Sequence, residues 1–91
     1  MKIVFLKSFL KDIKKIKEPK TARTIEQLIL DLKSANSLDE LKNIKRLKGY
    51  SLAYRIKTGN YRLGIYKESN HIELARFLKR EDIYKVFPKP K

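Results

Sequence analysis

The first half of the chain alternates apolar and charged residues at spacings that predict one strand and two helices. The β-branched and aromatic run at residues 3–6 predicts a short strand. Ser8 can cap the helix that follows, which ends before Pro19 and carries on its apolar face Phe9, Ile13 and Ile16. A second helix is predicted from Thr21 to about Asn36, with an apolar stripe that can cover a sheet, formed by Ile25, Leu28, Ile29 and Leu32.

The second half predicts a meander of short antiparallel strands. Ser37 and Glu40 stand at the spacing of a capping box, within a single capped turn over residues 37–43. Alternating runs then predict strands over residues 44–48, 52–57, 61–66 and 71–78, and the middle pair is joined by a hairpin turn at residues 58–60. A short segment through Tyr84 follows, and then a loose basic tail over residues 85–91.

Together these elements predict one α+β domain over residues 1–91, because a chain of this length supports a single core. We expect an N-terminal strand and two helices packed on one face of a mainly antiparallel, twisted sheet of about four strands. A short C-terminal segment follows the sheet. The face opposite the helices is expected to stay open.

Positive charge is concentrated in the second half of the chain. Lys and Arg number 23 against 10 Asp and Glu, which gives a formal net charge of +13. Residues 1–40 carry nine basic and six acidic side chains, whereas residues 41–67 carry eight basic side chains and no acid. No local ion pair neutralises this segment, so it needs an anionic partner or water. A Lys-rich surface that serves only solubility is the alternative, and we prefer that interpretation for the lysines of the first helix.

Alternation divides the side chains of the predicted hairpin between two faces. The core side is predicted to carry Leu52, Tyr54, Ile56, Tyr61, Leu63 and Ile65. The opposite side is predicted to expose Arg55, Lys57, Arg62 and Tyr66. Gly64 would leave bare backbone there for the close approach of a ligand. Arg donates two parallel hydrogen bonds to phosphate and Lys adds a point charge, so this side is suited to a phosphodiester.

The sequence offers little for other kinds of chemistry. It contains no cysteine, which excludes a disulfide framework and a thiolate metal site and fits a reducing, cytoplasmic location. Its longest apolar runs are too short for a membrane span. His71 lacks a second ligand at metal-binding spacing, and the adjacent Glu81 and Asp82 point apart as capping charges. We therefore expect no metal, no cofactor and no membrane partner.

Four short motifs, taken in order, resemble the RelE/ParE toxin superfamily. They are Leu47-Lys48-Gly49, Tyr54-Arg55-Ile56-Lys57, Gly59-Asn60-Tyr61-Arg62-Leu63 and Arg80-Glu81-Asp82-Ile83-Tyr84. The strand and two helices before them match the order of the family, so the resemblance spans nearly the whole chain. It implies a RelE-like fold and the toxin half of a type II toxin–antitoxin pair, neutralised by an acidic, RelB-like antitoxin.

For RelE-type members the resemblance also implies a ribosome-dependent endoribonuclease that cleaves mRNA without metal, with mRNA and ribosomal RNA as partners. The positions that match the family's active residues are Arg55, Lys57, Arg62, Arg80 and Tyr84. Lys57 would act as general base and Arg62 would hold the phosphorane. Arg80 would lie near the leaving oxygen, and Tyr84 would stack on a base or orient the nucleophile. Lys79 stands where many relatives carry His, which implies stronger phosphate binding and weaker proton transfer.

Two alternatives stay open at this point. A ParE-type gyrase inhibitor has the same fold and needs no phosphate-cleaving set of residues. A noncatalytic RNA-binding or ribosome-associated protein would need cations alone. The RNA-binding candidates beside the hairpin are Lys45, Arg46, Lys48 and Lys79.

Overall fold

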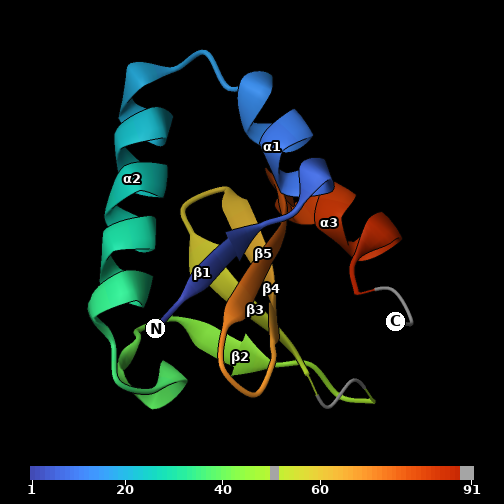
Figure 1. Ribbon diagram of the computed structural model, residues 1–91. Coiled ribbons are helices and arrows are strands. Elements are labelled where there is room, and N and C mark those ends of the chain that lie inside the picture. The colour runs from blue at the N-terminus through green and yellow to red at the C-terminus, as the bar shows by residue number, and fades with distance from the viewer. Residues whose placement is uncertain (50–51, 89–91) are drawn as a thin grey trace.

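The computed structural model describes residues 1–49 and 52–88, which form one sheet and the helices packed against it (Figure 1). In chain order the elements are β1 (Ile3–Phe5), α1 (Lys7–Lys14), α2 (Pro19–Ser34), the 3-10 turn η1 (Leu38–Glu40), β2 (Ile44–Arg46), β3 (Ala53–Thr58), β4 (Tyr61–Lys67), β5 (Ile72–Lys79) and α3 (Arg80–Val86). The predicted α+β class is confirmed. α2 begins at Pro19, two residues before the predicted start, because proline suits the first position of a helix.

The sheet has five strands in the order β1-β5-β4-β3-β2, whereas the sequence predicts about four. β2, β3, β4 and β5 form the predicted antiparallel meander. β1 adds to its far edge parallel to β5, with Ile3 opposite Ile72. Thr58 faces Tyr61 across the β3–β4 turn, and Gly59 at its centre has a φ of 60°, so the predicted hairpin turn is confirmed.

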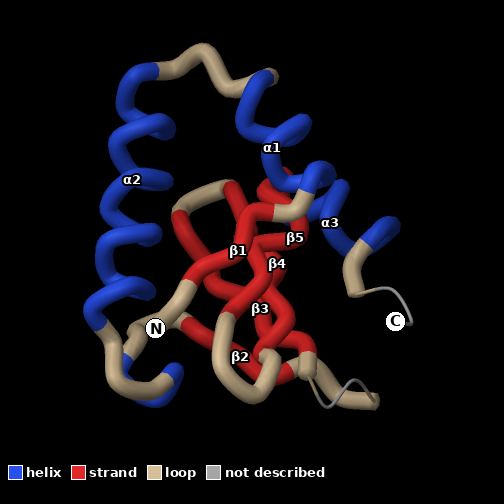
Figure 2. Tube along the Cα trace, in the orientation of Figure 1, coloured by secondary structure: helices blue, strands red, loops and turns tan. Residues whose placement is uncertain are grey.

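α1 and α2 cover one face of the sheet, which we call the helix face (Figure 2). Its core combines residues of both helices and η1 with apolar residues of β3, β4 and β5. The buried members are Phe9, Ile25, Leu32, Leu38, Ile56, Leu63, Ile65, Ile72, Leu74 and Phe77. The predicted apolar faces of both helices and of the hairpin therefore meet as expected. Leu52 is an exception, because it precedes β3 and is 42% exposed.

The opposite face, which we call the α3 face, is not open as predicted. α3 and the residue after it cover part of this face, and a second buried cluster forms there from Ala53, Tyr66, Ala75, Ile83 and Phe87. Tyr66, expected at the surface, is 7% exposed and its ring lies 5.1 Å from the ring of Phe87. A Cβ on Gly64 would lie 2.7 Å from Phe87, so the bare backbone of Gly64 accommodates this ring and not a ligand.

This packing also corrects the prediction of a loose tail over residues 85–91. α3 continues through Val86, and Phe87 is 6% exposed. Apolar burial of Ile83 and Phe87 therefore extends the ordered chain past Lys85. The remainder of the predicted tail, residues 89–91, lies outside the described residues.

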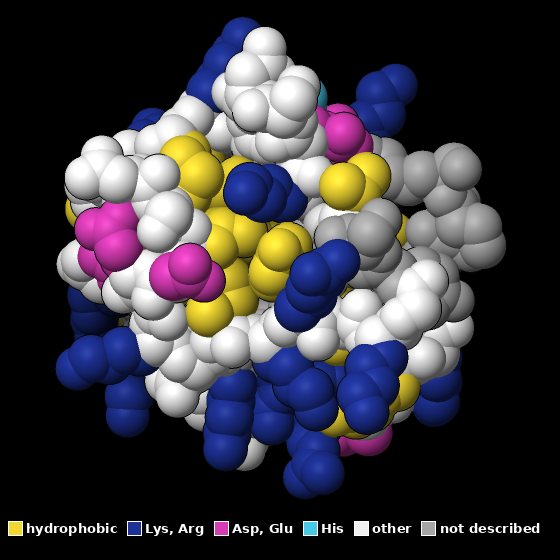
Figure 3. All heavy atoms as spheres, turned by 90° about the horizontal axis from the view of Figure 1, so that it is seen from below, with side chains coloured by type: hydrophobic (Ala, Val, Ile, Leu, Met, Phe, Trp, Pro, Cys, Tyr) yellow, Lys and Arg dark blue, Asp and Glu magenta, His cyan; other side chains and the backbone are white. Residues whose placement is uncertain are grey.

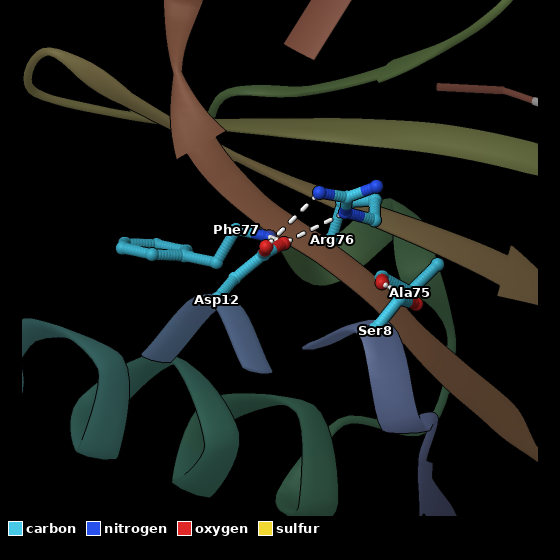
Figure 4. Close-up of polar contacts among 5 residues, drawn as sticks. All are labelled: Ser8, Asp12, Ala75, Arg76 and Phe77. Atoms are coloured by element: carbon cyan, nitrogen blue, oxygen red, sulfur yellow. Dashed lines mark hydrogen bonds and ion pairs between the residues drawn. The ribbon is translucent and has the colours of Figure 1, made fainter. Parts of the chain in front are cut away.

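A bulge interrupts β5 where it leaves β1. Leu74 faces Ile65 and Arg76 faces Gly64, so Ala75 between them has no partner on β4. Two polar side chains of α1 bind the backbone at this point (Figure 4). The Ser8 hydroxyl donates to the carbonyl of Ala75 at 2.6 Å, and the Asp12 carboxylate accepts from the amide of Phe77 at 2.9 Å. Ser8 is therefore not the predicted cap, because α1 begins one residue earlier and the Ser8 hydroxyl binds the bulge.

None of the helices within residues 1–49 and 52–88 is long and apolar enough to cross a membrane.

Candidate active site

A pocket of about 410 Å³ opens on the α3 face beside the second cluster. Three strands, β2, β3 and β4, and the helix α3 contribute its cations, and all five residues that match the family's active positions line it. The lining residues are Asn43, Ile44, Lys45, Arg55, Lys57, Arg62, Arg80 and Tyr84. Segments that are almost forty residues apart in the sequence therefore meet in one cavity.

Strand register explains why these cations share a side. Lys45 faces Arg55 across β2 and β3, and Lys57 faces Arg62 across β3 and β4. Directly opposed residues of antiparallel strands project from the same face, as do residues two apart on one strand. The predicted grouping of Arg55, Lys57 and Arg62 on one side of the hairpin is therefore what the register produces.

α3 places the remaining two residues above these strands. It begins at Arg80, whose backbone amide donates to the carbonyl of Asn60 at 3.0 Å, and this bond ties the helix to the hairpin turn. Arg80 and Tyr84 are one helical turn apart and so lie on the same side of α3. Both side chains line the pocket together with residues of β2 and β3.

Arg62 is held inside the protein, whereas the sequence predicts it at the surface. The residue is 7% exposed, and its Nη1 donates to the carbonyls of Gly59 and Tyr61 at 2.9 Å each. Both acceptors belong to the hairpin turn and the start of β4, so the turn itself orients the guanidinium. A guanidinium carries five N–H donors in a fixed planar arrangement, so the two bonds of Nη1 also fix the directions of the donors on the other nitrogens.

Tyr84 lies at the rim of the pocket and contacts two arginines. It is 53% exposed, and the Cζ of Arg55 lies 4.8 Å from the centroid of its ring, in cation–π geometry. A side-chain hydrogen bond with Arg80 is the largest effect on the pKa of Tyr84 and lowers it below its ordinary value of 10.0. Desolvation, the next largest effect, opposes this shift. The charges of Arg55, Arg80 and Arg62 lower the pKa further. The surrounding cations thus favour the phenolate.

The charge of the pocket is uniform. Among the described residues that line it there are five Lys or Arg side chains and no acid. Figure 3 views the end of the molecule at which η1 and β2 lie, and there Lys and Arg side chains form a band across the lower part of the face. The acid-free segment of the sequence supplies four of the five cations that line the pocket, Lys45, Arg55, Lys57 and Arg62.

Three of the four predicted RNA-binding residues do not line the pocket. Lys45 does, but Arg46 faces Tyr54 and so projects from the helix face. Lys79 faces Tyr61, which stacks on Phe77 in the helix-face core, so Lys79 also points away from Arg80. Lys48 is exposed beyond the end of β2.

Sequence reasoning missed Asn43, which lines the pocket although it carries no charge. Its φ is 62°, the one positive value for a residue other than glycine within the described ranges. Asn tolerates this left-handed conformation better than most residues. Its carbonyl accepts the amide of Lys57 at 3.0 Å and so connects the entry of β2 to β3. An Asn between a capped turn and a strand was the available signal.

A larger cavity of about 780 Å³ lies between α2 and β3 and shares Asn43 and Lys57 with the pocket. Its lining differs in character, because Asp31 and Glu40 stand there beside an apolar floor. Mixed charge suits a polyanion less well than the uniformly basic pocket does. We therefore take the smaller pocket as the candidate active site.

Within the described part of the chain, no three His, Asp or Glu side chains gather where they could hold a metal ion. Any chemistry of the pocket residues themselves is therefore that of guanidinium, ammonium, phenol and amide groups.

Comparison with known proteins identifies close relatives of the chain. No family model matches it. It is 43% identical to the toxin RelE3 of Methanocaldococcus jannaschii over 89 residues, which are 97% of this chain and 100% of that protein. It also matches a chain in the crystal structure of the RelB–RelE antitoxin–toxin complex from Methanococcus jannaschii, with 40% identity, a TM-score of 0.79 and coverage of 93% of this chain and 99% of that one. The YoeB dimer from Staphylococcus aureus, at 22% identity and a TM-score of 0.70 over 87% of this chain and 94% of that one, shares the fold.

Proposed function

The chain belongs to the RelE family of toxins, and from that premise we propose that it is the toxin of a type II toxin–antitoxin pair that cleaves mRNA on the ribosome. The observation that carries the proposal is the basic pocket in which Arg55, Lys57, Arg62, Arg80 and Tyr84 meet. A ParE-type gyrase inhibitor would not need this set of residues. Nor would a protein that only binds RNA, for which the surrounding cations suffice.

We propose that the nucleophile is the 2′-hydroxyl of the RNA itself. The O2′–phosphorus bond forms while the phosphorus–O5′ bond breaks, which leaves a 2′,3′-cyclic phosphate and a 5′-hydroxyl. One proton leaves O2′ and one must reach O5′, so the pocket needs a base and an acid. The charge that develops on the phosphorane needs fixed donors.

The lowered pKa of Tyr84 supports a revision of the roles suggested by sequence. Tyr84 ionises at lower pH than an ordinary tyrosine, so we propose it as the general base that accepts the proton from O2′. Lys57, a cation with three N–H donors, then supplies the proton to O5′. The sequence suggests Lys57 as base, and this revision gives Lys57 the role of acid instead.

Arg62 is best suited to hold the phosphorane. Its guanidinium is already oriented by two bonds to the hairpin backbone, so little reorganisation accompanies the reaction. Arg80 and Arg55 both contact Tyr84 and contribute both to phosphate binding and to the ionisation of the phenol. Lys45 extends the basic surface along β2 toward the flanking nucleotides.

An acidic RelB-like antitoxin is the proposed partner. The relative from Methanococcus jannaschii crystallised as a RelB–RelE complex, and the net charge of +13 of this chain supports an acidic binding segment. Neutralisation would follow if that segment covered or deformed the basic pocket.

Induced expression followed by mapping of transcript ends tests the proposal. We expect codon-positioned cuts with 5′-hydroxyl ends, lost in Arg62→Ala and retained in Arg46→Ala, whose side chain projects from the other face. Intact mRNA together with an SOS response would indicate gyrase poisoning and contradict the proposal. Intact mRNA with ribosome binding and no SOS response would identify a noncatalytic binder.

A further inference from the structure

Asp12 of α1 is a buried carboxylate that the proposed reaction does not use. It is 4% exposed and makes three contacts with β5. Its oxygens accept from Arg76 at 2.8 Å (Nε) and 3.0 Å (Nη2), and from the backbone amide of Phe77 at 2.9 Å. Figure 4 shows these bonds and that of Ser8 directed at consecutive residues of β5. Removing a charged group from water is costly, so such an arrangement calls for a function in folding or in activity.

The three contacts hold the edge of β5 just past the last residue paired with β1. Phe5 faces Leu74, and β1 ends there. The backbone groups of β5 beyond Leu74 therefore have no strand partner on that side, and Ser8 and Asp12, one helical turn apart, bind them instead. The Ser8 and Asp12 side chains thus bind the backbone of β5 across the bulge, as β1 does before it.

The bulge determines which way the rest of β5 faces. Before it, Ile65 is opposite Leu74; after it, Arg62 is opposite Leu78. With a regular ladder, Arg62 would be opposite Phe77 instead, and every later side chain of β5 would turn to the other face of the sheet. Phe77 would then leave the helix-face core, and the amide of Arg80 would lose its register with Asn60.

We propose that Asp12 is a positioning residue for the active site, which sets the entry of Arg80 and Tyr84 into the pocket by holding the β5 bulge in register. The inference rests on the proposed nuclease function. Asp12 belongs to an element that does not line the pocket, so it acts through β5 and the first turn of α3. Bulges beside active sites commonly redirect a side chain in this way.

A matched set of variants separates positioning from plain stabilisation. Asp12→Ala removes every contact, whereas Asp12→Asn keeps an oxygen for the amide of Phe77. Leu32→Ala is the control, because Leu32 is completely buried on α2 and makes no bond to β5. All are studied at a temperature at which circular dichroism shows each protein fully folded.

The first measurement is the amide spectrum of the 15N-labelled proteins. We expect Asp12→Ala to shift the signals of residues 78–84, and Asp12→Asn and Leu32→Ala to leave them close to wild type. Shifts in Asp12→Ala confined to α1 and residues 75–77, or equal shifts in Leu32→Ala, would overturn the proposal. This readout needs no activity, so it remains decisive if the wild type proves not to be a nuclease.

The second measurement is ribosome-dependent cleavage. A displacement of about 1 Å in a catalytic group lowers rates on the order of 100-fold, so kcat of Asp12→Ala should fall by that order while KM changes little. Asp12→Asn should recover most of the loss. A fall in kcat that Leu32→Ala reproduces would assign Asp12 to stability alone.

Discussion

Replacing Gly64 by Ala tests the packing of the α3 face most directly. A Cβ at this position would lie 2.7 Å from Cδ2 of Phe87 and 2.8 Å from Cγ and Cε2. The added methyl group therefore meets the body of a buried ring, and the ring or the strand must shift to accommodate it. We expect Gly64→Ala to destabilise the protein by about 1–3 kcal/mol, the usual cost of overpacking a core.

The sign of the effect should depend on Phe87. Gly in the interior of a strand costs about 0.5–1 kcal/mol relative to Ala, so without the ring the same substitution should stabilise. Phe87→Ala alone should cost about 3–5 kcal/mol. In that background we expect Gly64→Ala to be neutral or favourable by up to about 1 kcal/mol, which gives a coupling of roughly 1–4 kcal/mol.

Urea denaturation of the four proteins of this cycle measures the coupling, with equal m-values as the check on two-state behaviour. Equal and additive losses in both backgrounds would refute the reasoning, because Gly64 and Phe87 would then not be in contact. Nuclease activity of Gly64→Ala provides a second check. It should fall with the displacement of α3, which carries Arg80 and Tyr84.

Four further predictions concern the pocket. The single-turnover rate of the wild type should rise with pH with its midpoint below pH 10.0, because the pKa of Tyr84 is lowered, whereas Tyr84→Phe should abolish the rise. A rate that rises equally in both would exclude Tyr84 as base. Because the pKa of Tyr84 is lower in the folded state, its phenolate should stabilise the protein above about pH 10. This contribution should disappear as the pH falls through the lowered pKa. The difference in unfolding free energy between the wild type and Tyr84→Phe, measured against pH, tests this. Arg62→Ala should reduce the rate of cleavage about 10²–10³-fold. Arg62→Lys should recover little of this rate, because one ammonium cannot bind both the backbone and the phosphate. Full recovery would contradict the role of the oriented guanidinium. Asn43→Gly should retain full stability in urea, whereas Asn43→Val should lose about 1–2 kcal/mol, and equal losses would show that the side chain and not the positive φ matters.

Periodicity predicted the elements well because burial on the helix face follows a simple rule. Ile25 and Leu32 lie on the inner side of α2, and Ile56 and Leu63 alternate into the same core. The turn at Gly59 followed from residue chemistry alone. In α2 the face toward the core is buried and the other is exposed, which is the contrast that sequence patterns record.

The α3 face was harder to predict because polar and small residues pack there. Arg62 is buried by bonds to the backbone of its own turn, and the alternation rule does not distinguish that position from a solvated one. Gly64 leaves space for a ring 23 positions later, a contact of which a strand pattern contains no trace. One signal was present, since Leu74 and Phe77 are apolar at a spacing of three within a run that otherwise has a spacing of two. That break in period marks the bulge.

The five site candidates were grouped by strand alternation and by family resemblance together. Alternation alone joined Arg55, Lys57 and Arg62, because these positions lie on one hairpin. The approach of Tyr84 to Arg55 depends on the direction in which α3 leaves β5, and no local pattern encodes that direction. Arg46 and Lys79 were predicted to bind RNA because of their charge, but the strand register places both side chains on the helix face, away from the pocket.

The place of β1 in the sheet has a consequence for how the protein is made. Ile3 is synthesised among the first residues, yet its partner in the sheet is Ile72. Loop closure over such a separation is slow, and chains emerge from the ribosome at only about 5–20 residues per second. β1 and α1 must therefore wait, exposed, until β5 has been translated, and Asp12 cannot reach the bulge before then. A protein proposed to act on ribosomes would thus assemble its pocket only after most of its own synthesis is over, and an antitoxin made alongside it would have that interval in which to bind.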